Sequence, residues 1–156
     1  MELSTWIVKG VRGVHSMVMN TRQLPAMVSD SGAQQHQYQY DPNGNVSAIL
    51  DQTRGDGYSR TMEYDARDRL RVAASASFGG TGAHRYTYDA QDNLRTHITG
   101  DTSYEYYYDG ANRLTNLMNV ATGASVVGLS YDVQGNLSTR MVRPTRSRRA
   151  TGCVRW

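Results

Sequence analysis

The sequence predicts an all-β fold, in which antiparallel β-hairpin repeats form a curved sheet. The first observation is a Tyr-Asp pair that recurs five times, at intervals of 24, 24, 20 and 23 residues. Periods in this range are typical of repeat architectures. The second is the alternation of apolar and polar residues before each pair, which is the pattern of a half-buried strand. The third is a set of turn-forming residues directly after each pair.

Each turn is predicted from the residue four positions after the paired tyrosine. That residue is Gly, Asp or Asn in all five repeats, as in YDPNGNV at 40–46 and YDARDRL at 64–70. These residue types adopt positive φ at the lowest energetic cost. A branched aliphatic residue follows two positions later. Each repeat therefore reads as strand, tight turn, strand and a looser connection.

The Tyr-Asp pair itself has a structural explanation. A tyrosine ring buries about 150–250 Å² and keeps one polar end. The aspartate that follows can accept a hydrogen bond from the backbone N–H two residues on, which stabilises a turn. We therefore predict structural, not catalytic, roles for the paired residues and the turn residue of each repeat. These are Tyr40, Asp41, Gly44, Tyr64, Asp65, Asp68, Tyr88, Asp89, Asp92, Tyr108, Asp109, Asn112, Tyr131, Asp132 and Gly135.

The order of segments along the chain predicts three regions. Residues 1–37 lack the motif and are expected to be a degenerate repeat or a segment that leads into the array, with strands at Thr5–Val8 and His15–Met19. Residues 38–141 hold the five repeats. Residues 142–156 are expected to be a basic, disordered tail. Six arginines and no acid occur in the last 17 residues, so the net charge of +3 comes from this end. No aromatic residue lies among these arginines as a stacking platform, so nucleic acid is not expected as a partner.

Several other classes of protein are excluded by composition. The single cysteine, Cys153, excludes an internal disulfide framework. No apolar run approaches the length of a transmembrane helix. The apolar residues Trp6–Val8 are followed directly by Lys9, so a cleaved secretory signal is not expected.

Metal binding and catalysis are not expected either. Asp41, Asn43 and Asn45 have the spacing of a calcium-binding loop, but position 52, where such a loop needs an acid, is Gln52. The four histidines are dispersed, without ligands at metal-binding spacing. No phosphate-binding or nucleophile motif is present. The sequence therefore predicts no enzyme activity, no cofactor and no metal.

The repeated Y-D-x-x-G/D/N-N/R-L/V unit resembles the YD repeat of bacterial Rhs proteins, which is shared with insecticidal toxin-complex subunits and teneurins. The resemblance covers about residues 38–141. It implies a β-sheet that spirals into a hollow shell, which in bacteria encloses a toxic domain used against competitors or hosts. The implied partners are further YD-repeat segments or a cargo domain, and the implied location is secreted or at the cell surface.

Two departures from the family pattern limit this resemblance. The chain is too short to close a shell, and it lacks the aspartyl self-cleavage segment that ends many Rhs cores. We therefore expect a fragment of a longer array, without self-processing. The alternative function is a carbohydrate-binding or cell-surface adhesion module, in which exposed tyrosines such as Tyr107 stack on glycans.

Overall fold

The computed structural model describes residues 5–10, 13–31 and 33–142, and the side chains of 14–31 and 33–141. These residues form thirteen β-strands and two short 3-10 helices, and their order in the sheet follows their order in the chain. Every strand pairing for which a register is given is antiparallel. The predicted all-β class is confirmed. Residues 143–156 of the predicted tail, Cys153 included, lie outside the described residues.

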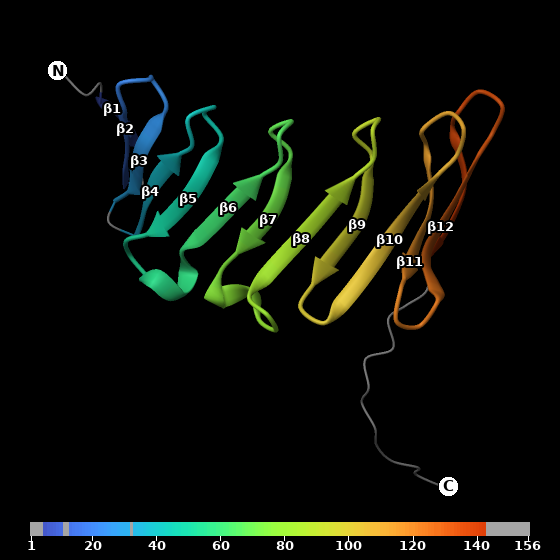
Figure 1. The fold of residues 1–156 in the computed structure, drawn as a ribbon. Helices are drawn as coiled ribbons and strands as arrows, with labels where there is room; N and C mark the ends of the chain where they lie inside the picture. Colours follow the sequence, from blue (N-terminus) through green and yellow to red (C-terminus); the bar gives the residue numbers. More distant parts are fainter. Residues whose placement is uncertain (1–4, 11–12, 32, 143–156) are drawn as a thin grey trace, which may run out of the picture. The chain divides into compact units, whose positions relative to one another are not determined.

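The chain divides into two compact units. Unit 1 consists of residues 1–87 and 97–101, and unit 2 of residues 88–96 and 102–156. Figure 1 labels the strands from β1 to β12. Unit 1 contains β1 (Thr5–Gly10), β2 (Gly13–Met19), β3 (Pro25–Asp30), β4 (Gln34–Tyr40), β5 (Val46–Asp51), β6 (Arg60–Tyr64), β7 (Leu70–Ala74) and β8 (Ala83–Tyr88). The last residue of β8, Tyr88, is assigned to unit 2.

Unit 2 contains the later hairpins. Strand β9 (Leu94–Thr99) begins in unit 2, and its residues from His97 onward belong to unit 1. The remaining strands are β10 (Thr102–Tyr108), β11 (Leu114–Asn119), β12 (Ala124–Tyr131) and β13 (Leu137–Val142). Strands thus occur in the segment before the repeats and in each of the five repeats.

A β-bulge precedes each paired tyrosine whose register is given. In the β6–β7 hairpin, Glu63 pairs with Val72 and Tyr64 with Leu70, so the register shifts by one residue between them. The same shift occurs before Tyr40, Tyr108 and Tyr131. A bulge increases local twist and changes the direction in which a side chain points. Each of these tyrosines therefore lies directly after a β-bulge, next to its turn.

The hydrophobic core is thin. Strand β6 shows the alternation that the sequence predicts, with Met62 and Tyr64 half-buried and Glu63 exposed. Among the described residues, however, the only hydrophobic side chains classed as buried are Ala48 at 5% exposure and Val72 at 8%. Because so little apolar surface is fully buried, the fold depends to a large extent on the backbone hydrogen bonds between strands and on the polar contacts of the turns.

The connections at the ends of the strands remote from the Tyr-Asp turns are more varied. In unit 1 they include the 3-10 helices η1 (Asp56–Tyr58) and η2 (Ala76–Phe78). Asp51 ends β5 with 4% exposure, and its carboxylate accepts bonds from the backbone N–H groups of Thr53 and Arg54 and from the Arg54 side chain. Within the described ranges, no helix has the length and apolar character needed to span a membrane.

Candidate functional site: the Tyr-Asp turns

The five Tyr-Asp turns share one backbone geometry. In the turn at 65–69, Asp65 N donates to Arg69 O at 2.9 Å and Asp68 N donates to Asp65 O at 3.1 Å. Equivalent pairs of bonds close the other four turns. The residue four positions after the tyrosine has positive φ in every case: +100° at Gly44, +59° at Asp68, +67° at Asp92, +58° at Asn112 and +86° at Gly135. The predicted left-handed position is confirmed.

The paired aspartate caps its own turn with one carboxylate oxygen. Asp65 Oδ1 accepts from Arg67 N at 2.9 Å and from Arg69 N at 3.1 Å. Asp89, Asp109 and Asp132 accept from the same two positions. Asp41 accepts from Gly44 N and Asn45 N. The hydrogen bond from the backbone N–H two residues after the aspartate was expected from the sequence. The bond from the backbone N–H four residues after it was not.

The second carboxylate oxygen binds the side chain four residues after the aspartate. Asp65 Oδ2 accepts from Arg69 Nε at 2.8 Å, and Asp89 Oδ2 from Asn93 Nδ2 at 3.1 Å. The corresponding donors in the other turns are Asn45, Arg113 and Asn136. The signal was visible in the sequence, because this position is always Asn or Arg, residue types whose side chains donate hydrogen bonds.

These contacts stabilise the ionised carboxylates. The hydrogen bond from the Arg69 side chain lowers the pKa of Asp65 to about 2; partial desolvation opposes the shift, and backbone N–H groups add to it. In Asp89, desolvation is the larger single effect and raises the pKa, but the combined bonds from Asn93 and Gln91 outweigh it. The pKa values of Asp41, Asp109 and Asp132 are lowered as well.

The paired tyrosines connect successive hairpins through their hydroxyl groups. Tyr64 Oη donates to Val46 O at 2.9 Å, and Tyr131 Oη donates to Leu114 O at 2.8 Å. Tyr108 Oη donates in the same way to Leu94 O at 3.0 Å. The acceptor is in each case the aliphatic residue that follows the preceding turn. Each of these three tyrosines therefore ties its own hairpin to the one before it.

A sixth turn of the same kind lies before the first Tyr-Asp pair, at residues 19–25. Asn20 takes the place of the aspartate, and its Oδ1 accepts from Arg22 N at 2.9 Å and from Leu24 N at 3.1 Å. Gln23 has the positive φ, +60°. Tyr40 Oη donates to Pro25 O at 2.7 Å, which is the position that later tyrosines use. An Asn in place of Asp, with Met19 in place of Tyr, hid this turn from the motif search.

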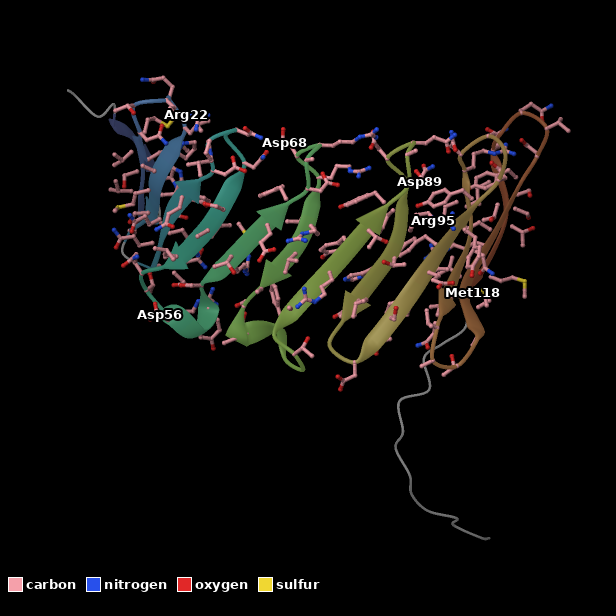
Figure 2. The ribbon with its side chains drawn as sticks, viewed as in Figure 1. Arg22, Asp56, Asp68, Asp89, Arg95 and Met118 are labelled. Atoms are coloured by element: carbon pink, nitrogen blue, oxygen red, sulfur yellow. The ribbon has the colours of Figure 1, made fainter. Side chains whose placement is uncertain are left out.

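Neighbouring turns are also linked within each unit. In unit 1, Arg22 donates to Asp41 O, and the amides of Asn43 and Asn45 both donate to Asp68 Oδ1 at 2.7 Å. Figure 2 labels Arg22 and Asp68 at one edge of unit 1, and Asp56 at the other. In unit 2, the Arg113 guanidinium lies 4.7 Å from the centre of the Tyr131 ring, a cation–π contact. The turns thus form polar ladders along the strand ends.

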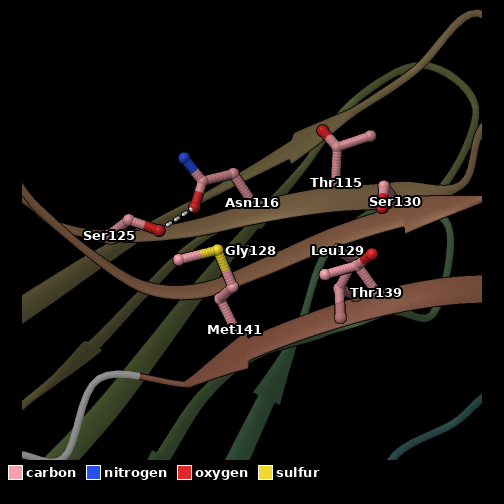
Figure 3. A pocket seen from close by; sticks show the side chains of 8 residues that line it. All are labelled: Thr115, Asn116, Ser125, Gly128, Leu129, Ser130, Thr139 and Met141. Atoms are coloured by element: carbon pink, nitrogen blue, oxygen red, sulfur yellow. Dashed lines mark hydrogen bonds between the residues drawn. The ribbon is translucent and has the colours of Figure 1, made fainter.

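Two shallow hollows offer little for chemistry. Figure 3 shows one of about 270 Å³ over β11, β12 and β13, where Gly128 leaves a gap beside Met141 and Ser125 Oγ donates to Asn116 Oδ1. Its lining holds no aromatic ring, so the glycan-stacking alternative gains no support there. The Tyr107 hydroxyl donates to Glu105 at 2.6 Å.

The other hollow, of about 400 Å³, has Asp56 as its only acid. In the ranges described, no three His, Cys, Asp or Glu residues are grouped to hold a metal.

Comparison with solved structures shows similar folds. The structure described as "Photorhabdus luminescens Tc holotoxin pore, Mutation TccC3-D651A" matches with a TM-score of 0.57 and 16% identity, over 86% of this chain and 9% of that chain. The structure described as "TcdB2-TccC3-Cdc42" matches with a TM-score of 0.52 and 12% identity, over 91% of this chain and 11% of that chain. This chain thus spans about a tenth of their length.

A comparison with curated proteins gives no match. The model of the Teneurin YD-shell family, in contrast, matches residues 17–149. That range begins before the first Tyr-Asp pair and includes the turn at 19–25. The repeated turns, the antiparallel hairpins and the extent of this match agree, and the chain therefore belongs to the Teneurin YD-shell family.

Proposed function

We propose that this chain forms part of the wall of a shell that encloses a toxin or effector domain. The observation that carries the proposal is the bond from a paired tyrosine to the backbone of the preceding hairpin, as between Tyr64 and Val46. Such a bond adds one hairpin to the next without a deep core. A protein built in this way forms an extended sheet with a large surface, which is what the wall of a shell requires.

A structural role, not a catalytic one, is supported by the use of the motif's polar groups. The Asp65 carboxylate accepts from two backbone N–H groups and from Arg69. A general base or nucleophile needs an atom that can reach a substrate. We extend the proposal to all the paired residues and turn residues predicted from the sequence, with residues 38–141 as the array and 1–37 as its degenerate beginning.

The partner that we propose is a cargo polypeptide together with further YD-repeat segments. This chain spans 9% and 11% of the toxin-complex chains that it resembles, so the rest of such a shell would come from other segments. The toxin-complex and holotoxin descriptions belong to those proteins, and they support a toxic cargo here. We further propose that the shell acts outside the cell that makes it, in competition between bacteria or against a host.

Protease protection tests this proposal. The protein that carries this chain is purified from its native source, and any second polypeptide that remains with it is identified by mass spectrometry. We expect that polypeptide to resist protease in native buffer and to be digested after urea opens the shell. A protein without an associated or covalently linked cargo domain, or with a cargo digested equally fast in both conditions, would contradict the proposal.

A further inference from the structure

Two histidines of unit 1 form a hydrogen-bonded pair across neighbouring strands. His84 lies in β8 and His97 in β9, and His84 Nδ1 is 3.0 Å from His97 Nε2. The ring planes are inclined by 19°, with their centres 5.3 Å apart. A hydrogen bond between two imidazole nitrogens requires one to donate its proton and the other to accept it. The pair therefore needs at least one neutral ring.

Aromatic rings hold both histidines in place. Tyr86 stacks on His97 with the ring centres 4.7 Å apart and an angle of 8° between the planes. Phe78, in η2, meets His84 edge-on at 4.6 Å. Both histidines are half-buried. The pair is thus held in an apolar frame, where an additional positive charge is poorly solvated.

The charges near the pair do not offset protonation. Arg85 follows His84 directly in β8 and so faces the other side of the sheet, and Arg95, two positions before His97 in sequence, is a cation that cannot offset protonation. On the strand beside β8, Ala73 pairs with His84 and carries no charge. Burial lowers the pKa of His97, and the charge of His84 lowers it further; no carboxylate contributes to the shift. Tyr86 also contacts the pair, through its stacking on His97.

We propose that His84 and His97 form a pH-sensitive latch that holds β8 to β9 near neutral pH and opens when both rings are protonated. With both rings protonated there is no acceptor for the bond, and two positive charges would face each other across 3.0 Å. The rings must then separate, and the stacking of Tyr86 on His97 is lost with them. This proposal concerns the fold and does not depend on the proposed shell function.

The direction of the pH effect follows from linkage. The folded pKa of His97 is lower than its unfolded value, so the unfolded chain binds more protons as the pH falls below about 6.5. The stability that the neutral pair provides is therefore complete above that pH and is lost on acidification toward the folded pKa. This window lies above the one in which carboxylates titrate, so the two effects are separable.

Denaturant titrations at pH 7.5 and 5.0 test the latch on the full chain. We expect the unfolding equilibrium constant of the unmodified protein to rise on acidification, by about tenfold for every unit by which the pKa of His97 is lowered. The H97Q variant should lose this rise, and H84Q should show a smaller one. Equal rises in H97Q and the unmodified protein would overturn the proposal.

An NMR titration of the histidine rings decides the case even if a variant does not fold. In the unmodified protein we expect His97 to titrate below about pH 6.5, and the ring resonances of Tyr86, which stacks on it, to shift in the same range. A His97 that titrates at or above the value of a free histidine would overturn the latch. So would a Tyr86 ring that does not respond to the protonation of His97.

Discussion

At the scale of single residues, the two members of the Tyr-Asp pair have different structural roles. The aspartate closes its own turn, and the tyrosine reaches back to the turn before it, as Asp65 and Tyr64 do. The two residues are adjacent in sequence but act in opposite directions along the array. Their constant spacing from the turn follows from this division, because a shift of one residue would exchange the two faces of the strand.

The hydroxyl of a paired tyrosine contributes a measurable part of the stability. We expect Tyr64→Phe to lower the free energy of unfolding by about 0.5–1.5 kcal/mol, because the bond to Val46 O is lost while the ring remains. Urea titration measures the change. Tyr58→Phe is the matched control, since Tyr58 is 47% exposed and lies outside the motif. Equal effects in both variants would show that the hydroxyl bond does not matter.

The paired aspartates predict a second pH window. The pKa of Asp65, about 2 in the folded chain, is lower than its ordinary value of 3.8. The unfolded chain therefore binds more protons between these values, and stability is present above about pH 4 and falls toward pH 2. Urea titrations from pH 5 to 2.5 should show a smaller loss in Asp65→Asn than in Asp56→Asn, whose aspartate lies outside the turns. The same loss in both would contradict this assignment.

At the scale of secondary-structure elements, the turns can tolerate substitution of the motif if the acceptor is kept. The hairpin of β2 and β3 has Asn20 where the later hairpins have Asp, yet its turn makes the same bonds. In this chain the turn geometry is therefore retained where the Tyr-Asp pair is not. A sequence search that accepts Asn for Asp, and a residue other than Gly at the position of positive φ, would extend the array by one turn here.

Asn20→Ala tests whether this degenerate turn matters. Loss of the amide leaves the N–H groups of Arg22 and Leu24 to water, and we expect a decrease of about 0.5–1.5 kcal/mol in the free energy of unfolding. Thr21→Ala, in the same turn, is the control. Hydrogen exchange should also become faster in β2 and β3 in the Asn20 variant. Unchanged exchange in both strands would argue against a structural turn at this place.

The connections opposite the Tyr-Asp turns contain a close approach of two glycines. A Cβ at Gly80, where φ is +51°, would lie 2.9 Å from the Cα of Gly100. We expect Gly80→Ala to destabilise unit 1 by about 1–3 kcal/mol, because the strain and the contact act together. Gly57→Ala is the control, since a Cβ there meets nothing within 4 Å. A thermal melt that ranks the two variants equally would contradict the argument.

The sequence predicted the elements of this fold better than it predicted their contacts. Alternation and turn residues located the hairpins, and the positive φ at Asp68 and Asn112 followed from residue type alone. The links between turns, such as Asn43 to Asp68, could not be predicted, because they depend on how adjacent hairpins are aligned. The pairing of His84 with His97 was missed for the same reason: histidines 13 residues apart in sequence become neighbours only once β8 and β9 are placed.

At the scale of the whole molecule, the thin core is the feature that connects the structure with the proposed function. Ala48 and Val72 are the only hydrophobic side chains classed as buried in the described residues, so each hairpin depends on its neighbours. Such a sheet is stable as part of a larger array and exposes its backbone at any free edge. The fold class and the family were predictable from the sequence because the repeat is local.

The central claim is that this chain is part of a wall around an enclosed volume. A cryo-EM map of the complete protein that contains it tests this claim directly. We predict that the strands of residues 38–141 lie side by side in the wall of a hollow shell, with the Tyr-Asp turns in register along their ends and density for a cargo polypeptide inside. A map in which these strands pack into a solid domain, or border no enclosed space, would contradict the account.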